Sequence, residues 1–204
     1  MSHFLVMVFS DEDRDVDTLL SPYDECLVVP HYISKSEIIR QGREELRNYY
    51  CNSSIYQEYL RDPDGYRQRN AKYPSHIKYL DDIPRLLLQS EEEVYQRCIA
   101  NYSSERICED GSVFSTANPV GKYDWYEIGG RWECGLKTKS GDMVSSALVR
   151  DIEVDELPIP FAVILPTYRW IDRDEITDCK NTFVEKFVNT ANPEWTLTLV
   201  DCHV

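Results

Sequence analysis

The stretch HFLVMVF, from His3 to Phe9, is a nearly continuous apolar run. Such a run is typical of a strand that is buried on both faces or lies at the centre of a sheet. The other end of the chain carries a second β-prone run, TLTLV at 196–200, in which polar and apolar residues alternate. A third strand is expected at 161–165, which is apolar and has proline on both sides. These three runs predict a sheet that uses both ends of the chain.

The middle of the chain changes to helical spacing. Ser34 and Glu37 have the spacing of a capping box, which predicts that a helix begins there. Apolar residues then recur at helical spacing up to about residue 60, so that one long helix is expected, with a break near Asn52. A second Ser-x-x-Glu motif at Ser90 predicts another helix over 91–102.

The order of these elements predicts the fold class. Asp110-Gly111 is a hairpin signal, further extended segments are expected at 123–128 and 131–138, and the apolar spacing at 182–189 predicts a helix. Helices and strands are segregated along the chain, which favours an α+β fold with a largely antiparallel sheet and helices on one face. We expect a single domain over 1–204. We expect a helical or irregular insertion in this domain at about 62–90, where turn residues and polar residues accumulate.

Composition favours a folded protein of the cytoplasm. Hydrophobic residues make up 42% and aromatic residues 12% of the 204 residues, which is enough to build a core. No basic segment precedes the first apolar run, and no run approaches the length of a membrane span, so neither a signal peptide nor a membrane protein is expected. The seven Cys are scattered without a Cys-x-x-Cys pair, which favours reduced thiols over a disulfide framework.

The formal charge of −14 limits the partners. Nonspecific nucleic-acid binding requires Lys and Arg to replace counterions, so an acidic chain disfavours it. A basic host protein, or a small anion bound in a locally positive pocket, remains compatible with this charge. No motif predicts a cofactor.

The segment NPVGKYDWYEIGGRW, at 118–132, concentrates aromatic rings, positive charge and glycine. Rings can stack on a planar ligand, an Arg can pair with phosphate or carboxylate, and glycine N–H groups can form an anion-binding nest. We therefore expect a site for a planar anionic, nucleotide-like molecule. Its predicted residues are Asn118, Lys122, Asp124, Trp125, Tyr126, Gly129, Gly130, Arg131 and Trp132.

The same segment has a purely structural interpretation. Trp125 and Trp132 could be core anchors, the two glycines could form a bulge, and Arg131 could pair with a structural carboxylate such as Asp124. A nucleoside triphosphatase is not expected, since Gly121-Lys122 lacks the remaining residues of a phosphate-binding loop.

Catalytic and metal-binding signals are weak. Asp24 and Glu25 are adjacent carboxylates in a turn and are the only candidates for acid–base work, with a turn or local cap as the alternative. No metal site is expected, because Cys202 and His203 are consecutive in a strand and point to opposite faces, even if His3 lies nearby.

Three stretches together resemble a family of uncharacterised proteins from bacteriophages and bacterial mobile elements. They are PYDE at 22–25, the run STANPVGKYDWYEIGGRW at 115–132, and the terminal DCHV at 201–204. Family members commonly have Trp where this chain has Tyr123. The resemblance implies a phage or mobile-element context and no particular activity, and a looser similarity to phage and plasmid proteins implies a ferredoxin-like domain.

Three hypotheses of function follow. The first is a protein that binds a nucleotide-like anion through the aromatic and Arg segment. The second is an acidic interaction protein, such as a DNA mimic or an inhibitor of a host factor, and the third is an enzyme with a cryptic active site.

Overall fold

The computed structural model describes residues 2–176 and 183–204, and of Asp174 only the backbone. The chain divides into two compact units. The sheet unit comprises Met1–Val29 and Ala117–Val204, and the helical unit comprises Pro30–Thr116. The insertion expected at 62–90 lies within the helical unit. Together the units contain helices and a mixed sheet, which confirms the α+β class.

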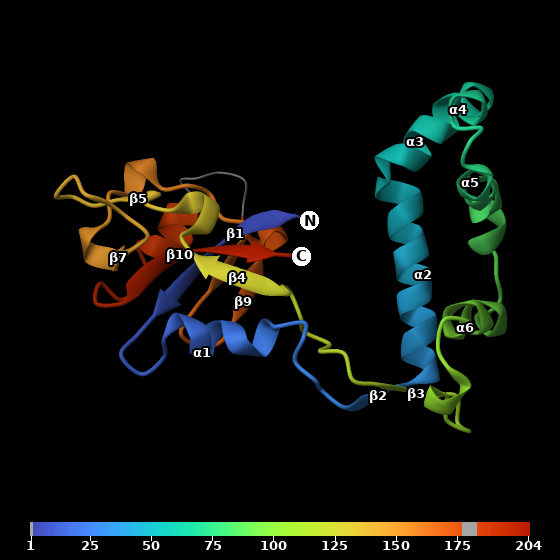
Figure 1. Cartoon of the computed structure of the whole chain (residues 1–204), viewed down its shortest axis with the longest axis horizontal. Helices are drawn as coiled ribbons and strands as arrows, with labels where there is room; N and C mark the ends of the chain where they lie inside the picture. The colour runs from blue at the N-terminus through green and yellow to red at the C-terminus, as the bar shows by residue number, and fades with distance from the viewer. Residues whose placement is uncertain (1, 177–182) are drawn as a thin grey trace. The chain divides into compact units, whose positions relative to one another are not determined.

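The sheet unit is built on the two ends of the chain. Strand β1 (His3–Ser10) pairs antiparallel with β10 (Thr196–His203) over its whole length, with His3 opposite His203. The strand order is β4-β10-β1-β8-β9, and β7 also pairs with β10. Only the β1–β8 pair is parallel among these strands, so the sheet is largely antiparallel. Figure 1 shows β1, β10 and β4 side by side. The other bounds are β4 Trp125–Ile128, β7 Ser146–Leu148, β8 Ala162–Ile164 and β9 Trp170–Asp172.

The alternation of β1 supplies two hydrophobic cores, one on each face of the sheet. Leu5, Met7 and Phe9 enter one core, and Val6 and Val8 enter the other, because successive strand residues point to opposite faces. All five side chains are buried, as expected for the continuous apolar run at a sheet centre.

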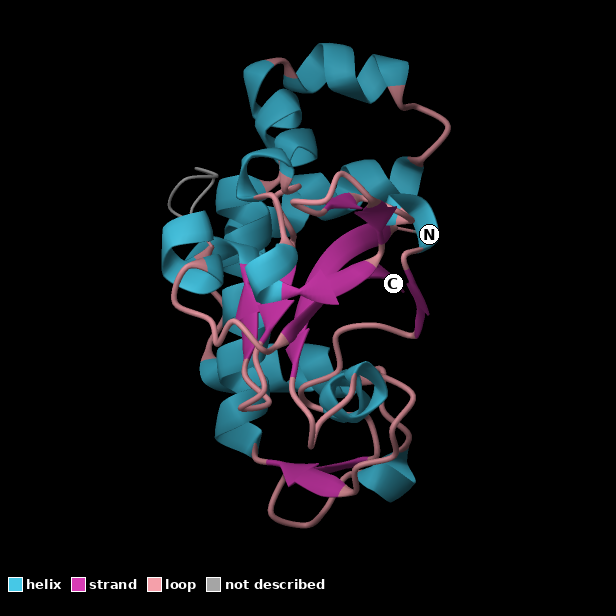
Figure 2. Cartoon of the chain, turned by 90° about the vertical axis from the view of Figure 1, so that its left-hand side faces the viewer, coloured by secondary structure: helices cyan, strands magenta, loops and turns pink. Residues whose placement is uncertain are grey.

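Helical segments cover both faces of this sheet, whereas helices on one face were expected. Helix α1 (Val16–Leu20) packs on Val6 and Val8, and the π-helix Val184–Val188 packs on the opposite face through Phe187. Figure 2 shows the sheet strands in magenta. Both faces are covered because β1 is apolar at every position from Phe4 to Phe9. The ferredoxin-like arrangement is not confirmed. The start of the helix expected at 182–189 lies outside the described residues.

The helical unit is dominated by one long helix. Helix α2 contacts α6 and α5, which lie along it in Figure 1, and the chain breaks between α2 and α3 at Ser53, next to the expected break. Its two hydrophobic clusters contain only residues of this unit and include four buried tyrosines. The helices are α2 Lys35–Asn52, α3 Ser54–Arg61, α4 Pro63–Arg69, α5 Pro74–Leu86 and α6 Glu91–Ile99.

The two expected capping boxes differ in the structure. At α6, Ser90 Oγ accepts from the N–H of Glu93 while the Glu93 carboxylate accepts from the N–H of Ser90, which completes the box. At α2, Ser34 Oγ accepts from the N–H of Glu37, but the Glu37 carboxylate turns to Arg40. The Glu37 carboxylate therefore pairs with the Arg40 guanidinium in place of the hydrogen bond to the backbone N–H of Ser34 that would complete the box.

Short two-stranded pairs complete the fold. In the helical unit, β2 (His31–Ile33) pairs with β3 (Val113–Ser115), and a bridge from Ile107 to Val113 closes the turn at Gly111. The sheet unit holds a second small pair, β5 (Leu136–Lys137) with β6 (Met143–Val144). No helix in the part of the chain that the structure describes has both the length and the apolar character to cross a membrane.

Candidate functional site

The double glycine forms a tight turn over a buried carboxylate. Gly129 and Gly130 have φ values of +75° and +48°, which favour glycine, and the chain continues as a 3-10 turn, Gly130–Trp132. The N–H of Arg131 donates to Oδ2 of Asp201 at 3.0 Å. A Cβ at Gly130 would lie 2.4 Å from Cβ of Asp201, so the approach requires glycine.

This turn corrects one sequence expectation. An extended segment was predicted over 131–138, but only Leu136–Lys137 is a strand. Positive φ at both glycines redirects the chain before Trp132. The anion that the glycine segment binds is the protein's own Asp201, whose side chain is almost completely buried.

Asp201 also holds His3. Its Oδ1 lies 2.9 Å from Nδ1 of His3, and the side chains are 3% and 19% exposed. Because a carboxylate oxygen accepts hydrogen bonds, Nδ1 of His3 is the donor in this contact. Nε2 is then the ring nitrogen that can accept a hydrogen bond from a ligand.

His3 lines a cavity of about 400 Å³ at this end of the sheet, which we call the His3 cavity. Such a volume lies within the usual range for small-molecule sites, roughly 300–1,000 Å³. Trp132 and Phe161 supply aromatic rings, and Arg173 supplies a positive charge. The lining residues are His3, Phe4, Leu5, Trp132, Ile159, Pro160, Phe161 and Arg173.

Trp125 and Arg131 lie close to this region without lining the cavity. Trp125 is opposite His203 in the β4–β10 pair, and directly opposite residues share a face of the sheet, so it lies on the face of His3 and Asp201. Its side chain is half exposed. The Arg131 side chain is exposed, and the described residues place no carboxylate in ion-pair contact with it.

Tyr126 is separated from these residues by the sheet. It is opposite Cys202 and packs on the core beneath α1, where its ring meets Tyr123 edge-on. Its hydroxyl donates to Asp17 at 2.5 Å. Burial and this hydrogen bond raise the pKa of Tyr126 well above its ordinary value. The structure therefore places Tyr126 apart from Trp125 and Trp132.

Lys122, Asn118 and Asp124 all make internal contacts. Lys122 Nζ donates to Asp172 Oδ2 at 2.9 Å. The Asn118 amide donates to the carbonyls of Pro22 and Asp24 at 2.7 and 2.8 Å, which ties two loops together. Asp124 Oδ1 lies 2.6 Å from Nδ1 of His203.

The candidate carboxylates Asp24 and Glu25 lie in a turn next to Tyr123. Asp24 Oδ1 accepts from the N–H of Cys26 at 2.8 Å, and the N–H of Glu25 donates to the carbonyl of Tyr123. This geometry matches the local turn that was the alternative to an acid–base role. Neither residue lines the His3 cavity.

Two histidines meet at the edge of the sheet. The rings of His3 and His203 lie 5.1 Å apart, edge to face, and each Nδ1 has its own carboxylate partner. Within the described residues, no group of three or more His, Cys, Asp or Glu side chains could hold a metal ion.

Sequence reasoning missed His3, Phe161 and Arg173 as lining residues of one cavity. A signal was present in β10, a largely buried strand in which Asp201 must find a polar partner. The register that brings Asp201 to His3 joins the two ends of the chain, and no local pattern contains it.

The acidic charge is uneven along the chain. The helical unit has 12 Lys and Arg against 14 Asp and Glu, a formal charge of −2, so that −12 of the total of −14 belongs to the sheet unit. A basic partner would therefore meet its complementary charge on the sheet unit.

Comparison with known proteins gives no match. No protein-family model, curated protein or solved structure is similar to this chain.

Proposed function

We propose that this protein binds a planar anionic small molecule, nucleotide-like in character, in the His3 cavity. The observation that supports this most strongly is the meeting of Trp132, Phe161, His3 and Arg173 around one cavity of about 400 Å³. Trp132 belongs to the segment predicted from the sequence. The charged partner is Arg173 in place of Arg131.

Each lining group has a part in recognition. Trp132 and Phe161 offer ring surface for stacking, and Phe161 is 43% exposed. Arg173 supplies the charge for a phosphate or carboxylate, because a guanidinium can donate two parallel hydrogen bonds. His3, fixed by Asp201, offers Nε2 to a polar group of the ligand.

A ligand screen with paired variants tests this proposal. Nucleoside monophosphates and cyclic dinucleotides are screened by thermal shift, and dissociation constants are measured for those that stabilise the protein. We expect Arg173→Gln to weaken binding by about tenfold or more, as for loss of one charge-assisted hydrogen bond. Arg169→Gln, which removes an equal charge from an exposed ion pair with Glu175, is the control.

Two results oppose the proposal. Absence of binding across the panel contradicts it. If Arg131→Ala abolishes binding while Arg173→Gln does not, the ligand lies at the glycine turn and not in the His3 cavity.

A second candidate function is catalysis at the same cavity. The His3–Asp201 pair is the arrangement in which a carboxylate orients a histidine for proton transfer. Incubation of each bound ligand with the protein, followed by product analysis, tests this. Turnover that His3→Gln abolishes even at ligand concentrations that saturate the variant supports an enzyme, and an unchanged ligand supports pure binding.

A further inference from the structure

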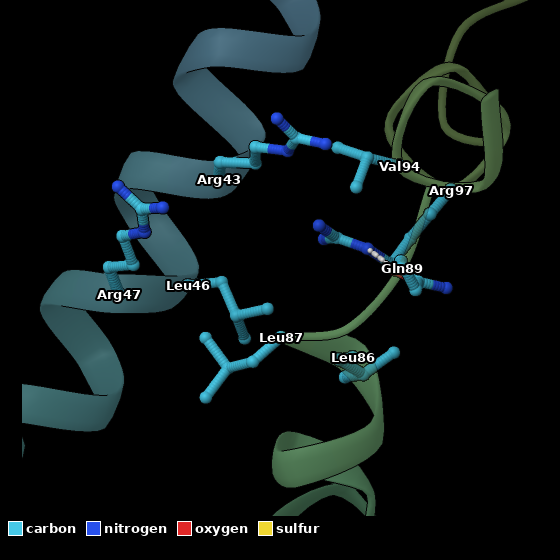
Figure 3. A pocket seen from close by; sticks show the side chains of 8 residues that line it. All are labelled: Arg43, Leu46, Arg47, Leu86, Leu87, Gln89, Val94 and Arg97. Carbon is cyan, nitrogen blue, oxygen red and sulfur yellow. Dashed lines mark hydrogen bonds between the residues drawn. The ribbon is translucent and has the colours of Figure 1, made fainter. Parts of the chain in front are cut away.

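The helical unit holds a second cavity that is rich in positive charge. It has a volume of about 270 Å³ and lies between α2, the end of α5 and α6. We call it the arginine cavity, because Arg43, Arg47 and Arg97 line it together with Leu46, Leu87 and Gln89. Figure 3 shows the guanidinium groups of Arg43 and Arg97 in the space between α2 and α6, while Arg47 comes from the next turn of α2.

The charge in this cavity is poorly balanced by carboxylates. Arg97 donates from Nε to Gln89 Oε1 at 3.1 Å and from Nη2 to the carbonyl of Gly42 at 3.2 Å, and both acceptors are neutral. Arg43 lies 3.6 Å from Glu91, which is longer than a hydrogen bond, and the Glu91 side chain is 73% exposed. The described residues place no carboxylate in ion-pair contact with Arg47 or Arg97.

Other arginines of the same unit have carboxylate partners. Arg40, Arg67 and Arg69 each contact two carboxylates. An internal balance of charge is thus common in this unit, and the arginine cavity departs from it. Arg47 and Arg97 have no carboxylate in ion-pair contact among the described residues, and the one partner of Arg43 is the exposed Glu91. The three guanidinium groups therefore leave a net positive charge where the walls are partly apolar.

The conformation of Arg97 favours a bound anion. Its two hydrogen bonds, one to Gln89 and one to the backbone of α2, fix the guanidinium before any ligand arrives. Pre-organised donors bind with a smaller loss of conformational entropy. Leu46 and Leu87 line the same cavity. A ligand that carries a small apolar group beside its negative charge can therefore contact these leucines as well as the arginines.

We propose that the arginine cavity binds a phosphate monoester of a small organic molecule, as a site separate from the His3 cavity. A phosphate monoester carries close to two negative charges at neutral pH, which suits several guanidinium groups better than a single carboxylate does. The volume of about 270 Å³ lies just below the usual range for small-molecule sites, which suits a compact ligand such as a phosphate monoester with one small organic group.

Calorimetric titration of the full chain with inorganic phosphate, phenyl phosphate and benzoate tests this proposal. We expect phenyl phosphate to bind most tightly, phosphate less tightly and benzoate weakest. Arg43→Gln and Arg47→Gln should each weaken phenyl phosphate binding by about tenfold, the effect of one lost charge-assisted hydrogen bond. Arg61→Gln removes an equal charge from an exposed position outside the cavity and should change the affinity less than twofold.

Arg97 requires a milder change because it also holds α6 to α2. Arg97→Lys keeps the charge but loses the planar guanidinium, which can donate two parallel hydrogen bonds. We therefore expect weaker binding of phenyl phosphate, with unchanged helicity by circular dichroism. The proposal is overturned if neither phosphate compound binds, if benzoate binds as well as phenyl phosphate, or if Arg61→Gln weakens binding as much as Arg43→Gln. Loss of phenyl phosphate binding in Arg173→Gln would instead place that ligand in the His3 cavity.

Discussion

Nδ1 of His3 lies 2.9 Å from Oδ1 of Asp201, although 198 positions separate the two residues in the chain. The contact joins the first strand of the sheet to the last one, and the glycine turn closes over the same carboxylate. We expect Asp201→Asn to lower the free energy of unfolding by about 1–3 kcal/mol, because a buried carboxylate loses a charge-assisted hydrogen bond. Urea unfolding measures this. An unchanged midpoint would mean that the contact contributes nothing.

The glycine turn should tolerate no side chain at Gly130. Gly130→Ala combines a positive φ with a Cβ 2.4 Å from Asp201, and we expect a loss of stability of about 2 kcal/mol or more. Gly141→Ala is the matched control, since Gly141 also has positive φ but no atom lies within 4 Å of its Cβ. Equal losses in the two variants would show that backbone strain alone matters and that the approach to Asp201 does not.

Cys202 should be chemically inert in the folded protein. Burial and then the charge of Asp201 raise the pKa of its thiol from 9.0 to about 12, so at pH 8 the thiolate fraction is roughly a thousandfold lower than in an unfolded chain. Alkylation followed by mass spectrometry should modify the exposed Cys51 and Cys134 first. Modification of Cys202 at the same rate as these two would contradict the burial.

Asp172 should make stability depend on acid pH. Partial burial alone would raise its pKa, but the hydrogen bonds from Lys122 and from Trp170 lower it below the ordinary value of 3.8. A carboxyl group with a lowered pKa stabilises the folded state above its ordinary pKa, and this contribution disappears as pH falls through the folded value. Asp172→Asn should therefore unfold at lower urea than the native chain at pH 6, and the difference should shrink below pH 3.8. A difference that does not change with pH would contradict this.

The two units should respond separately to core substitutions. All four Trp lie in the sheet unit, and ten of the fourteen Tyr lie in the helical unit, so tryptophan fluorescence reports on one unit alone. Leu80→Ala should destabilise the helical unit by about 2–5 kcal/mol while the fluorescence midpoint stays unchanged. Leu197→Ala, in the core of the sheet unit, should move that midpoint. If both variants move it equally, the chain unfolds as one cooperative body.

The elements that could be predicted were those with strong local patterns. The continuous apolar run of β1, the alternation in β10 and the capping box at Ser90 each depend on residues within one element. They were sufficient for the α+β class and for a sheet that uses both ends of the chain.

The site could be predicted only in part, because its contacts are distant in sequence. The glycine pair indicated an anion, but its ligand is the carboxylate of Asp201, 70 positions away from Arg131. Tyr123 precedes β4 and packs with Tyr126 on the face opposite Trp125, so only part of the aromatic segment lies near His3. The resemblance to phage and mobile-element proteins, the second hypothesis of an acidic interaction protein and a location in the cytoplasm stay predictions.

Ligand binding in the His3 cavity is measured most directly by a nuclear magnetic resonance titration of the tryptophan indole N–H signals with a nucleoside monophosphate. Trp132 lines the His3 cavity, whereas Trp195 packs on the same core without lining it. We expect a saturable shift of the Trp132 signal, no shift of the Trp195 signal, and loss of the effect in Arg173→Gln. Binding that leaves Trp132 unmoved, or a shift that survives Arg173→Gln unchanged, would contradict binding in this cavity.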